Sequence, residues 1–188
     1  ILINEGDELF QVALTDGEKD IILGASNGKG IRFSESDIRP MGRISAGVRG
    51  ILVEGNEKVV GMAIVNTDGD EIVIVTDKGY GKRTNVDAFR VQVRGGKGVK
   101  ALNLTAKNGT MVSLLTVRGD EDLMIVTDKG RIWGTIGGGA VEYRALQMAG
   151  KVLKEKSCFV HSFTLNKDDI QNLGMVCGGE AKVFFQYI

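Results

Sequence analysis

The sequence repeats itself with a period of 51 residues, and this period restricts the possible folds more than any other feature does. An aliphatic run, a short polar stretch and a turn glycine occur together three times, with the glycines at Gly28, Gly79 and Gly130. A second phrase, Gly47-Val48-Arg49-Gly50-Ile51, returns at the same distance as Gly98-Val99-Lys100-Ala101-Leu102. A period of about 50 residues is typical of arrays or propellers of small sheets, whose units bury their cores against one another. Because active sites seldom repeat and surfaces often do, the repeat points first to an extended binding surface.

Each repeat contains short runs that are rich in aliphatic or β-branched residues, as strands are. These runs occupy residues 9–14, 21–25, 59–65, 72–76, 112–117 and 123–127. Turn sequences such as Asn27-Gly28 separate them and favour the positive φ angles of tight hairpins. One repeat is therefore predicted to be a four-stranded antiparallel unit of two hairpins with a basic connector, at residues 34–50 and again at 85–100. The predicted fold class is mainly β, with blades of four-stranded antiparallel sheet.

The repeat does not continue beyond Gly134. Residues 140–156 space their apolar side chains as one face of a helix does, and residues 183–188 return to strand character. We therefore expect two domains. Residues 1–133 are predicted to form about two and a half blades, and residues 134–188 a smaller α+β tail with one helix and terminal strands.

The charges of the chain sum to zero, with 24 Lys and Arg against 24 Asp and Glu, so the total charge does not indicate a nucleic-acid binder. Their distribution is uneven. Residues 1–20 are acidic, whereas residues 78–100 hold seven Lys or Arg and a single acid, Asp87. Such asymmetry can give a neutral protein a basic face, although a solvated surface of mixed charge is the alternative.

The two cysteines, Cys158 and Cys177, lie far apart in the sequence, as is common in proteins of reducing compartments. No run approaches the about 20 apolar residues that a membrane-spanning helix needs. We therefore expect a cytoplasmic protein without a membrane partner.

Several further phrases occur in order at the spacing of the repeat. They are Asn4-Glu5-Gly6-Asp7-Glu8-Leu9, Ile31-Arg32-Phe33, Ile38-Arg39-Pro40-Met41-Gly42-Arg43, Gly79-Tyr80-Gly81-Lys82-Arg83-Thr84 and Arg94-Gly95-Gly96-Lys97-Gly98-Val99. With these phrases, residues 1–133 resemble the C-terminal domain of the DNA gyrase A protein, with the related subunit of topoisomerase IV as the nearest alternative. The resemblance implies a β-pinwheel that wraps double-stranded DNA independently of sequence and so contributes to supercoiling.

The same resemblance implies the partners and the location of the protein. The partners would be the remainder of the gyrase A protein and the gyrase B protein, in the bacterial cytoplasm at the nucleoid. The catalytic tyrosine of that enzyme belongs to another domain, so this chain is expected to be a non-catalytic part of a type II topoisomerase, without a cofactor or a metal.

Basic residues follow the hairpin turns and fill the connectors, where repetition would align them along a curved stripe. A stripe of this kind binds duplex through phosphates and bends it without reading bases. The stretch from Gln92 to Gly98 also resembles a glycine-rich box of the family, with Val93 in place of an arginine. Its glycines would let backbone N–H groups approach phosphates, although an ordinary glycine-rich connector is the alternative. The candidate DNA-binding residues are Arg32, Arg39, Arg43, Arg49, Lys82, Arg83, Arg90, Arg94, Gly95, Gly96, Lys97 and Lys100.

Two phrases of the tail, at residues 134–142 and 173–180, resemble the N-terminal domain of XdhC/CoxI-type accessory proteins. That resemblance implies an alternative function, in which the tail handles molybdenum cofactor for xanthine dehydrogenase-type enzymes. The candidate residues would be Cys177, Gly178 and Gly179, because a thiolate can ligate a soft metal and glycines leave room for a phosphate. A cysteine buried at the start of a strand is the other interpretation of Cys177.

An array that ends within a blade leaves strand edges unpaired, and unpaired edges invite other chains. We therefore expect self-association through open blade edges, or an edge that the tail covers.

Overall fold

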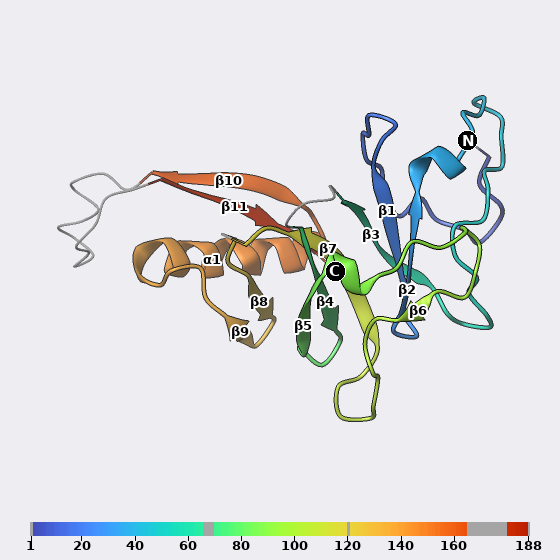
Figure 1. The fold of residues 1–188 in the computed structure, drawn as a ribbon. Helices are drawn as coiled ribbons and strands as arrows, with labels where there is room; N and C mark the ends of the chain where they lie inside the picture. The colour runs from blue at the N-terminus through green and yellow to red at the C-terminus, as the bar shows by residue number, and fades with distance from the viewer. Residues whose placement is uncertain (1, 66–69, 120, 165–179, 188) are drawn as a thin grey trace. The chain divides into compact units, whose positions relative to one another are not determined.

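A computed structural model describes residues 2–65, 70–119, 121–164 and 180–187. The chain divides into two compact units, Ile1–Gly119 and Asp120–Ile188. Among these residues, the regular elements of the first unit are strands and short 3-10 turns, and those of the second are strands and a long helix (Figure 1).

The first sheet has four antiparallel strands in the order β3-β1-β2-β6. Their bounds are Asp20–Ala25 for β1, Lys29–Ser34 for β2, Val59–Val65 for β3 and Val99–Lys100 for β6. The turn between β1 and β2 needs Gly28, whose φ is +79° and whose Cβ would lie 2.7 Å from the carbonyl oxygen of Leu102.

The second sheet repeats the first with three antiparallel strands in the order β5-β4-β7. Their bounds are Glu71–Thr76 for β4, Gly81–Asn85 for β5 and Met111–Val117 for β7. The pairing of Asp20 with Ser34 in the first sheet returns 51 positions later as that of Glu71 with Asn85. The structure thus confirms the predicted mainly β fold, and one blade has four strands. These strands are not two hairpins of one repeat, as the sequence predicted, because residues 9–14 are exposed and form no strand, and the fourth strand is β6 from the following repeat. The position that would repeat β6 in the second blade falls within the helix α1 (Gly139–Glu155), so that blade has three.

A connector follows each hairpin of the first unit. The first connector (residues 35–52) and the second connector (residues 86–102) begin with the 3-10 turns η1 (Glu35–Asp37) and η2 (Val86–Ala88). Ser34 and Asn85 cap these turns, because their side chains accept hydrogen bonds from the backbone two residues later.

The two blades bury a common core. Ile22 and Val65 from the first sheet, Ile72 and Ile74 from the second, and Phe89 from the second connector belong to one cluster, and all are at most 2% exposed. A Cβ on Gly61 would lie 2.6 Å from backbone atoms of Leu114, so β3 and β7 approach too closely for a side chain there. Neither sheet could remove this face from water without the other.

A buried ion pair lies under the second connector. The Nε of Arg32 donates to Asp20 Oδ2 at 2.7 Å, and its Nη1 donates to the carbonyl oxygens of Val86 and Phe89 at 3.3 and 3.4 Å. Arg32 is 8% exposed. Its guanidinium therefore fastens the second connector to the first blade.

Within the described ranges, the second unit contains two antiparallel strand pairs and a helix. They are β8 (Met124–Thr127) with β9 (Gly130–Gly134), then α1, and β10 (Phe159–Thr164) with β11 (Glu180–Phe185). Met124 and Val126 of the third repeat hairpin pack against a core formed by α1, β10 and β11, which includes Ala145, Phe163 and Phe185. The unit therefore begins before this hairpin, whereas the sequence placed the domain boundary at residues 133 and 134, because α1 supplies the apolar cover that the hairpin needs.

One carboxylate organises the start of α1. Oε2 of Glu142 accepts hydrogen bonds from the backbone N–H groups of Ile136 at 3.2 Å and Gly138 at 3.1 Å, and from the Thr135 hydroxyl. Its other oxygen pairs with Arg131. The Thr135 hydrogen bond, then the two amides and Arg131, hold the pKa of Glu142 below its usual range against the opposing effect of burial.

We expect Glu142→Gln to lower the melting temperature of the second unit at neutral pH. A carboxyl whose pKa is depressed in the folded state stabilises that state above its unfolded pKa of about 4.3, and the effect is lost as pH falls through the folded pKa. The difference between wild type and variant in thermal unfolding should therefore be large at pH 7 and close toward pH 3. A difference that persists at pH 3 would contradict this role. Glu155→Gln, at the exposed C-terminal end of α1, is the control and should leave the melting temperature unchanged or slightly raised.

We expect Arg32→Met to destabilise the first unit by about 3 kcal/mol, because it removes the ionic partner of Asp20, whose side chain is only 16% exposed. Urea unfolding should show a lower midpoint with an unchanged slope. The double variant Asp20→Asn/Arg32→Met removes both charges and should recover part of the loss. If the double variant is less stable than Arg32→Met, the ion pair is not the source of the effect.

Candidate nucleic-acid interface

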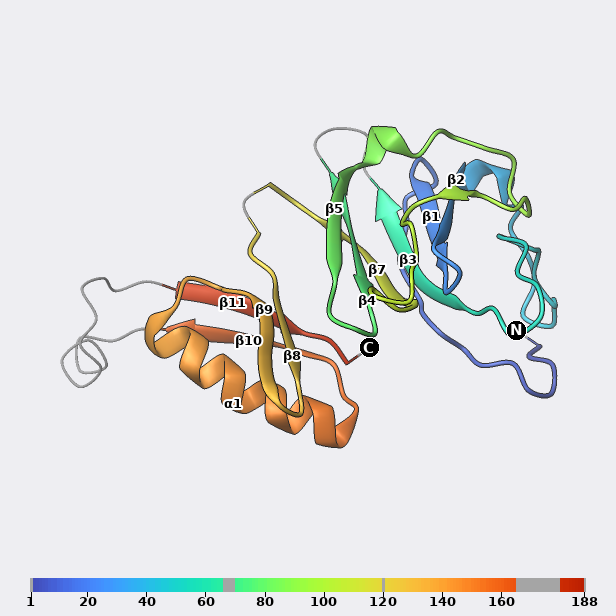
Figure 2. The ribbon, with the colours of Figure 1, turned by 90° about the horizontal axis from the view of Figure 1, so that it is seen from below.

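The two connectors lie side by side and are joined by backbone hydrogen bonds (Figure 2). The amide of Leu52 donates to the carbonyl of Gly96 at 2.9 Å, and the amide of Gly95 donates to the carbonyl of Gly50 at 2.5 Å. Segments that are about 45 residues apart in the sequence thus form one surface. The structure brings most of the candidate residues together on these connectors.

The glycine-rich box acts as a brace within this surface. Arg94 spans the connectors, since its Nε donates to the carbonyl of Asp37 at 3.1 Å and its Nη1 to that of Arg49 at 3.2 Å. The amide of Gly95 is already bonded to Gly50 and does not face a ligand. A Cβ on Gly98 would lie 2.5 Å from the carbonyl oxygen of Gly30, so this glycine allows the connector to approach β2. The glycines that we have described thus serve contacts within the chain.

The structure places Arg32 in the interior, although the sequence suggested a surface cation. The reason is a fixed spacing between acids and arginines in the two repeats. An acid lies 12 residues before each repeated arginine, so that Asp20 pairs with Arg32 and Glu71 pairs with Arg83. The repeated arginine is thus first a partner of the repeated acid. Unlike Arg32, Arg83 keeps a side chain that is 40% exposed.

The remaining candidate cations lie at the surface. Lys97 is 3.7 Å from Glu54, and both side chains are 68% exposed, a geometry worth at most about 1 kcal/mol. The exposed candidates are Arg39, Arg43 and Arg49 on the first connector, Arg90, Lys97 and Lys100 on the second, and Lys82 on β5. Exposed cations on adjacent connectors can contact phosphates with little desolvation of the protein.

Two basic residues of the first unit were missed from the sequence. Lys29 lies directly opposite Lys100 in the pairing of β2 with β6. The ammonium of Lys107 lies 5.9 Å from the centre of the Tyr80 ring, which is 44% exposed. Neither lysine has a basic equivalent 51 residues away in the neighbouring repeat, so a search restricted to repeated positions passes over both.

An acidic group anchors the start of the first connector. The Glu35 carboxylate accepts a hydrogen bond from the backbone N–H of Lys19 at 2.6 Å. A hydrogen bond from the Thr15 side chain and this amide lower the pKa of Glu35, while burial acts in the opposite direction. The carboxylate therefore stays ionised at neutral pH and offsets part of the positive potential at this end of the surface.

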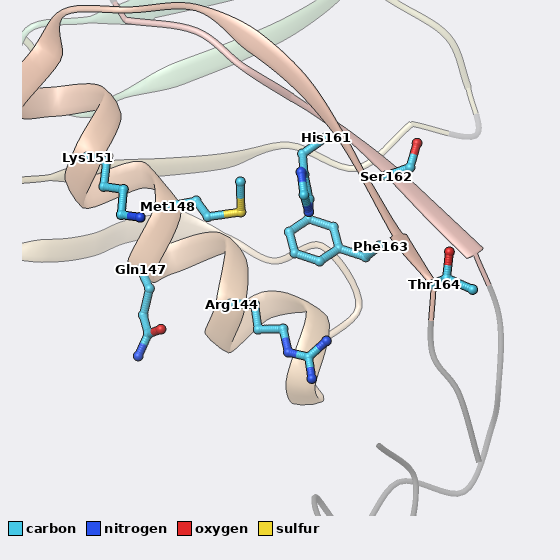
Figure 3. A pocket seen from close by; sticks show the side chains of 8 residues that line it. All are labelled: Arg144, Gln147, Met148, Lys151, His161, Ser162, Phe163 and Thr164. Atoms are coloured by element: carbon cyan, nitrogen blue, oxygen red, sulfur yellow. The ribbon is translucent and has the colours of Figure 1, made fainter. Parts of the chain in front are cut away.

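The second unit has a cavity of about 460 Å³ between α1 and β10 (Figure 3). His161 and Phe163 point from β10 toward Met148 of the helix, and their rings meet edge to face at 4.6 Å. The complete lining is Arg144, Gln147, Met148, Lys151, His161, Ser162, Phe163 and Thr164. It contains cations and no carboxylate.

The candidates of the alternative function, Cys177, Gly178 and Gly179, lie outside the described residues. Within the described part of the chain, no three His, Cys, Asp or Glu side chains are grouped to hold a metal. No helix within the described ranges is both long and apolar enough to cross a membrane.

Two family models match different parts of the chain. The model of the DNA gyrase C-terminal domain, a beta-propeller, matches residues 19–66 and 70–118, and that of the XdhC and CoxI family matches residues 122–164. The second match ends before the phrase at residues 173–180. Among solved structures, the C-terminal domain of DNA topoisomerase IV is similar with a TM-score of 0.61 and 25% identity, over 67% of this chain and 39% of that one. The E. coli ParC C-terminal domain, at 18% identity, shares the fold with a TM-score of 0.59 over 78% of this chain and 58% of its own.

The curated relatives include the DNA gyrase A proteins of Staphylococcus aureus strains MRSA252 and NCTC 8325 / PS 47. Each is 47% identical to this chain over 133 residues, which is 70% of the chain and 15% of the relative. The chain thus spans only a small part of the length of these relatives. The blades, their register and these matches show that the chain belongs to the family of the DNA gyrase C-terminal domain.

Proposed function

We propose that the first unit holds duplex DNA through its phosphates and curves it, without reading base sequence, as the wrapping module of a type II topoisomerase. The observation that carries the proposal is the joining of two basic connectors into one surface by the contacts of Arg94, Gly95 and Gly96. Phosphate contacts of this kind position a duplex and carry no sequence information themselves.

The rest of the proposal concerns the context of the module. The unit would contribute to supercoiling while the chemistry, including the catalytic tyrosine, resides elsewhere in the gyrase A protein. Its partners would be that remainder and the gyrase B protein, at the nucleoid in the bacterial cytoplasm. We include self-association through open blade edges, because β5 pairs only with β4 among the described strands.

We expect the double variant Arg39→Ala/Lys100→Ala to weaken binding to duplexes of any sequence alike. Each phosphate that the variant no longer neutralises should reduce the slope of log affinity against log salt by about 0.9. Fluorescence anisotropy with two unrelated duplexes of equal length, at several salt concentrations, measures both effects.

The matched control is Lys129→Ala/Lys154→Ala, which removes the same charge from exposed positions of the second unit. It should leave the salt slope unchanged. Equal effects of the two double variants would show that net charge, not the connector surface, governs binding. Absence of duplex binding by the wild type at low salt would refute the proposed function.

A further inference from the structure

The second connector covers the outer edge of the first blade by strand pairing. Val99 pairs with Gly30 and Lys100 with Lys29, which makes β6 the outer strand of that sheet. The amides of Ala101 and Leu102 donate to the carbonyl of Gly28 at 2.9 and 3.0 Å, and the amide of Gln92 donates to that of Arg32 at 2.7 Å. These contacts show how a connector of this chain recognises a hairpin edge.

The equivalent edge of the second blade has no such cover among the described strands. β5 corresponds to β2 at the period of 51 residues and pairs only with β4. Gly81 and Arg83 occupy the places of Gly30 and Arg32. Alternate residues of a strand direct their backbone groups to the same side, so the N–H and C=O groups of Gly81 and Arg83 point to the open edge.

The segment of the first connector that corresponds to β6 has no strand paired with it among the described strands. Gly47 and its equivalent Gly98 both have a left-handed backbone conformation, with φ of +86° and +70°. A Cβ on Gly98 would meet the Gly30 carbonyl oxygen at 2.5 Å, whereas a Cβ on Gly47 would meet nothing within 4 Å. Val48 and Arg49 belong to no strand, and Val48 is 37% exposed. The backbone conformation that fits an edge is thus present, with open space in front of it.

We propose that the first connector of a second copy of this chain adds to the β5 edge, head to tail. The register follows from the β2 and β6 pair, with Val48 opposite Gly81 and Arg49 opposite Tyr80. The amide of Met41 would bond to the carbonyl of Arg83. This proposal specifies the self-association part of the proposed function and does not require DNA binding. Since the two surfaces differ, the contact is heterologous and leaves a free end on each copy.

The charges of the two surfaces predict how salt acts on the assembly. In this register Arg49 lies opposite Tyr80, the equivalent of Lys29 in the Lys29–Lys100 pair, and Lys82 is its diagonal neighbour on the same face of the sheet. Added salt screens the repulsion between Arg49 and Lys82 and should strengthen assembly, whereas it weakens phosphate binding. Self-association, measured by sedimentation without DNA, should therefore rise with salt, whereas DNA binding, measured by anisotropy, should fall. If one of the two activities is absent, the other can still be measured.

The first test compares Gly47→Ala with Gly17→Ala by sedimentation velocity over a concentration series. Gly17 has a φ of +92° and also has nothing within 4 Å, so both variants carry the same backbone strain and an equally open environment. Gly47→Ala should weaken assembly by about tenfold or more, since its Cβ would strike the partner strand, while Gly17→Ala should assemble as the wild type does. Equal assembly by Gly47→Ala and the wild type would overturn the proposal, as would a wild type that stays monomeric.

The second test uses the two different ends. Gly81→Pro removes the backbone donor of the β5 edge and leaves the first connector intact. Alone, Gly81→Pro and Gly47→Ala should each assemble at least about tenfold more weakly than the wild type does. Mixed in equal amounts, they should form a 1:1 dimer through the intact β5 edge of Gly47→Ala and the intact connector of Gly81→Pro, and nothing larger. Circular dichroism establishes that each variant is folded. Two folded variants that stay monomeric when mixed would exclude the head-to-tail contact. This outcome is also the one expected if the second unit already covers the β5 edge.

Discussion

The rest of the first unit depends on the crossing of a connector from its own blade to the edge of the preceding one. The second connector contributes β6 to the first sheet and Phe89 to the core between the blades. It also supplies the carbonyl groups that the buried Arg32 requires. Backbone pairing, apolar burial and a buried charge are therefore coupled, so that a single blade would lose all three together.

This coupling explains why equivalent residues have different environments. Arg32 and Arg83 occupy the same place in their repeats, and each pairs with an acid on the neighbouring strand. A connector covers the first, whereas the second remains partly exposed. The period of the sequence therefore shows that the two arginines are related, but their access to a phosphate depends on what lies over them.

The hairpin of the third repeat illustrates the same dependence in the second unit. Its turn sequence forms β8 and β9 as the earlier repeats form their hairpins. Its apolar residues, however, pack with α1, β10 and β11 instead of another blade. Local sequence is sufficient for the hairpin, and the helix that follows decides which core it joins.

The sequence by itself determined the three repeat hairpins with turns at Gly28, Gly79 and Gly130, their 51-residue period and the position of the basic connectors. It also predicted a helix at residues 140–156, within one residue of the observed α1 at each end. These features follow from local periodicity and turn chemistry. Only the tertiary structure decided that Arg32 is buried, that Arg94 and Gly95 hold the connectors together, and that the third hairpin belongs to the second unit. Each of these depends on a contact between residues far apart in the chain. A repeat shows which positions are equivalent, whereas packing decides which of them water and ligands can reach.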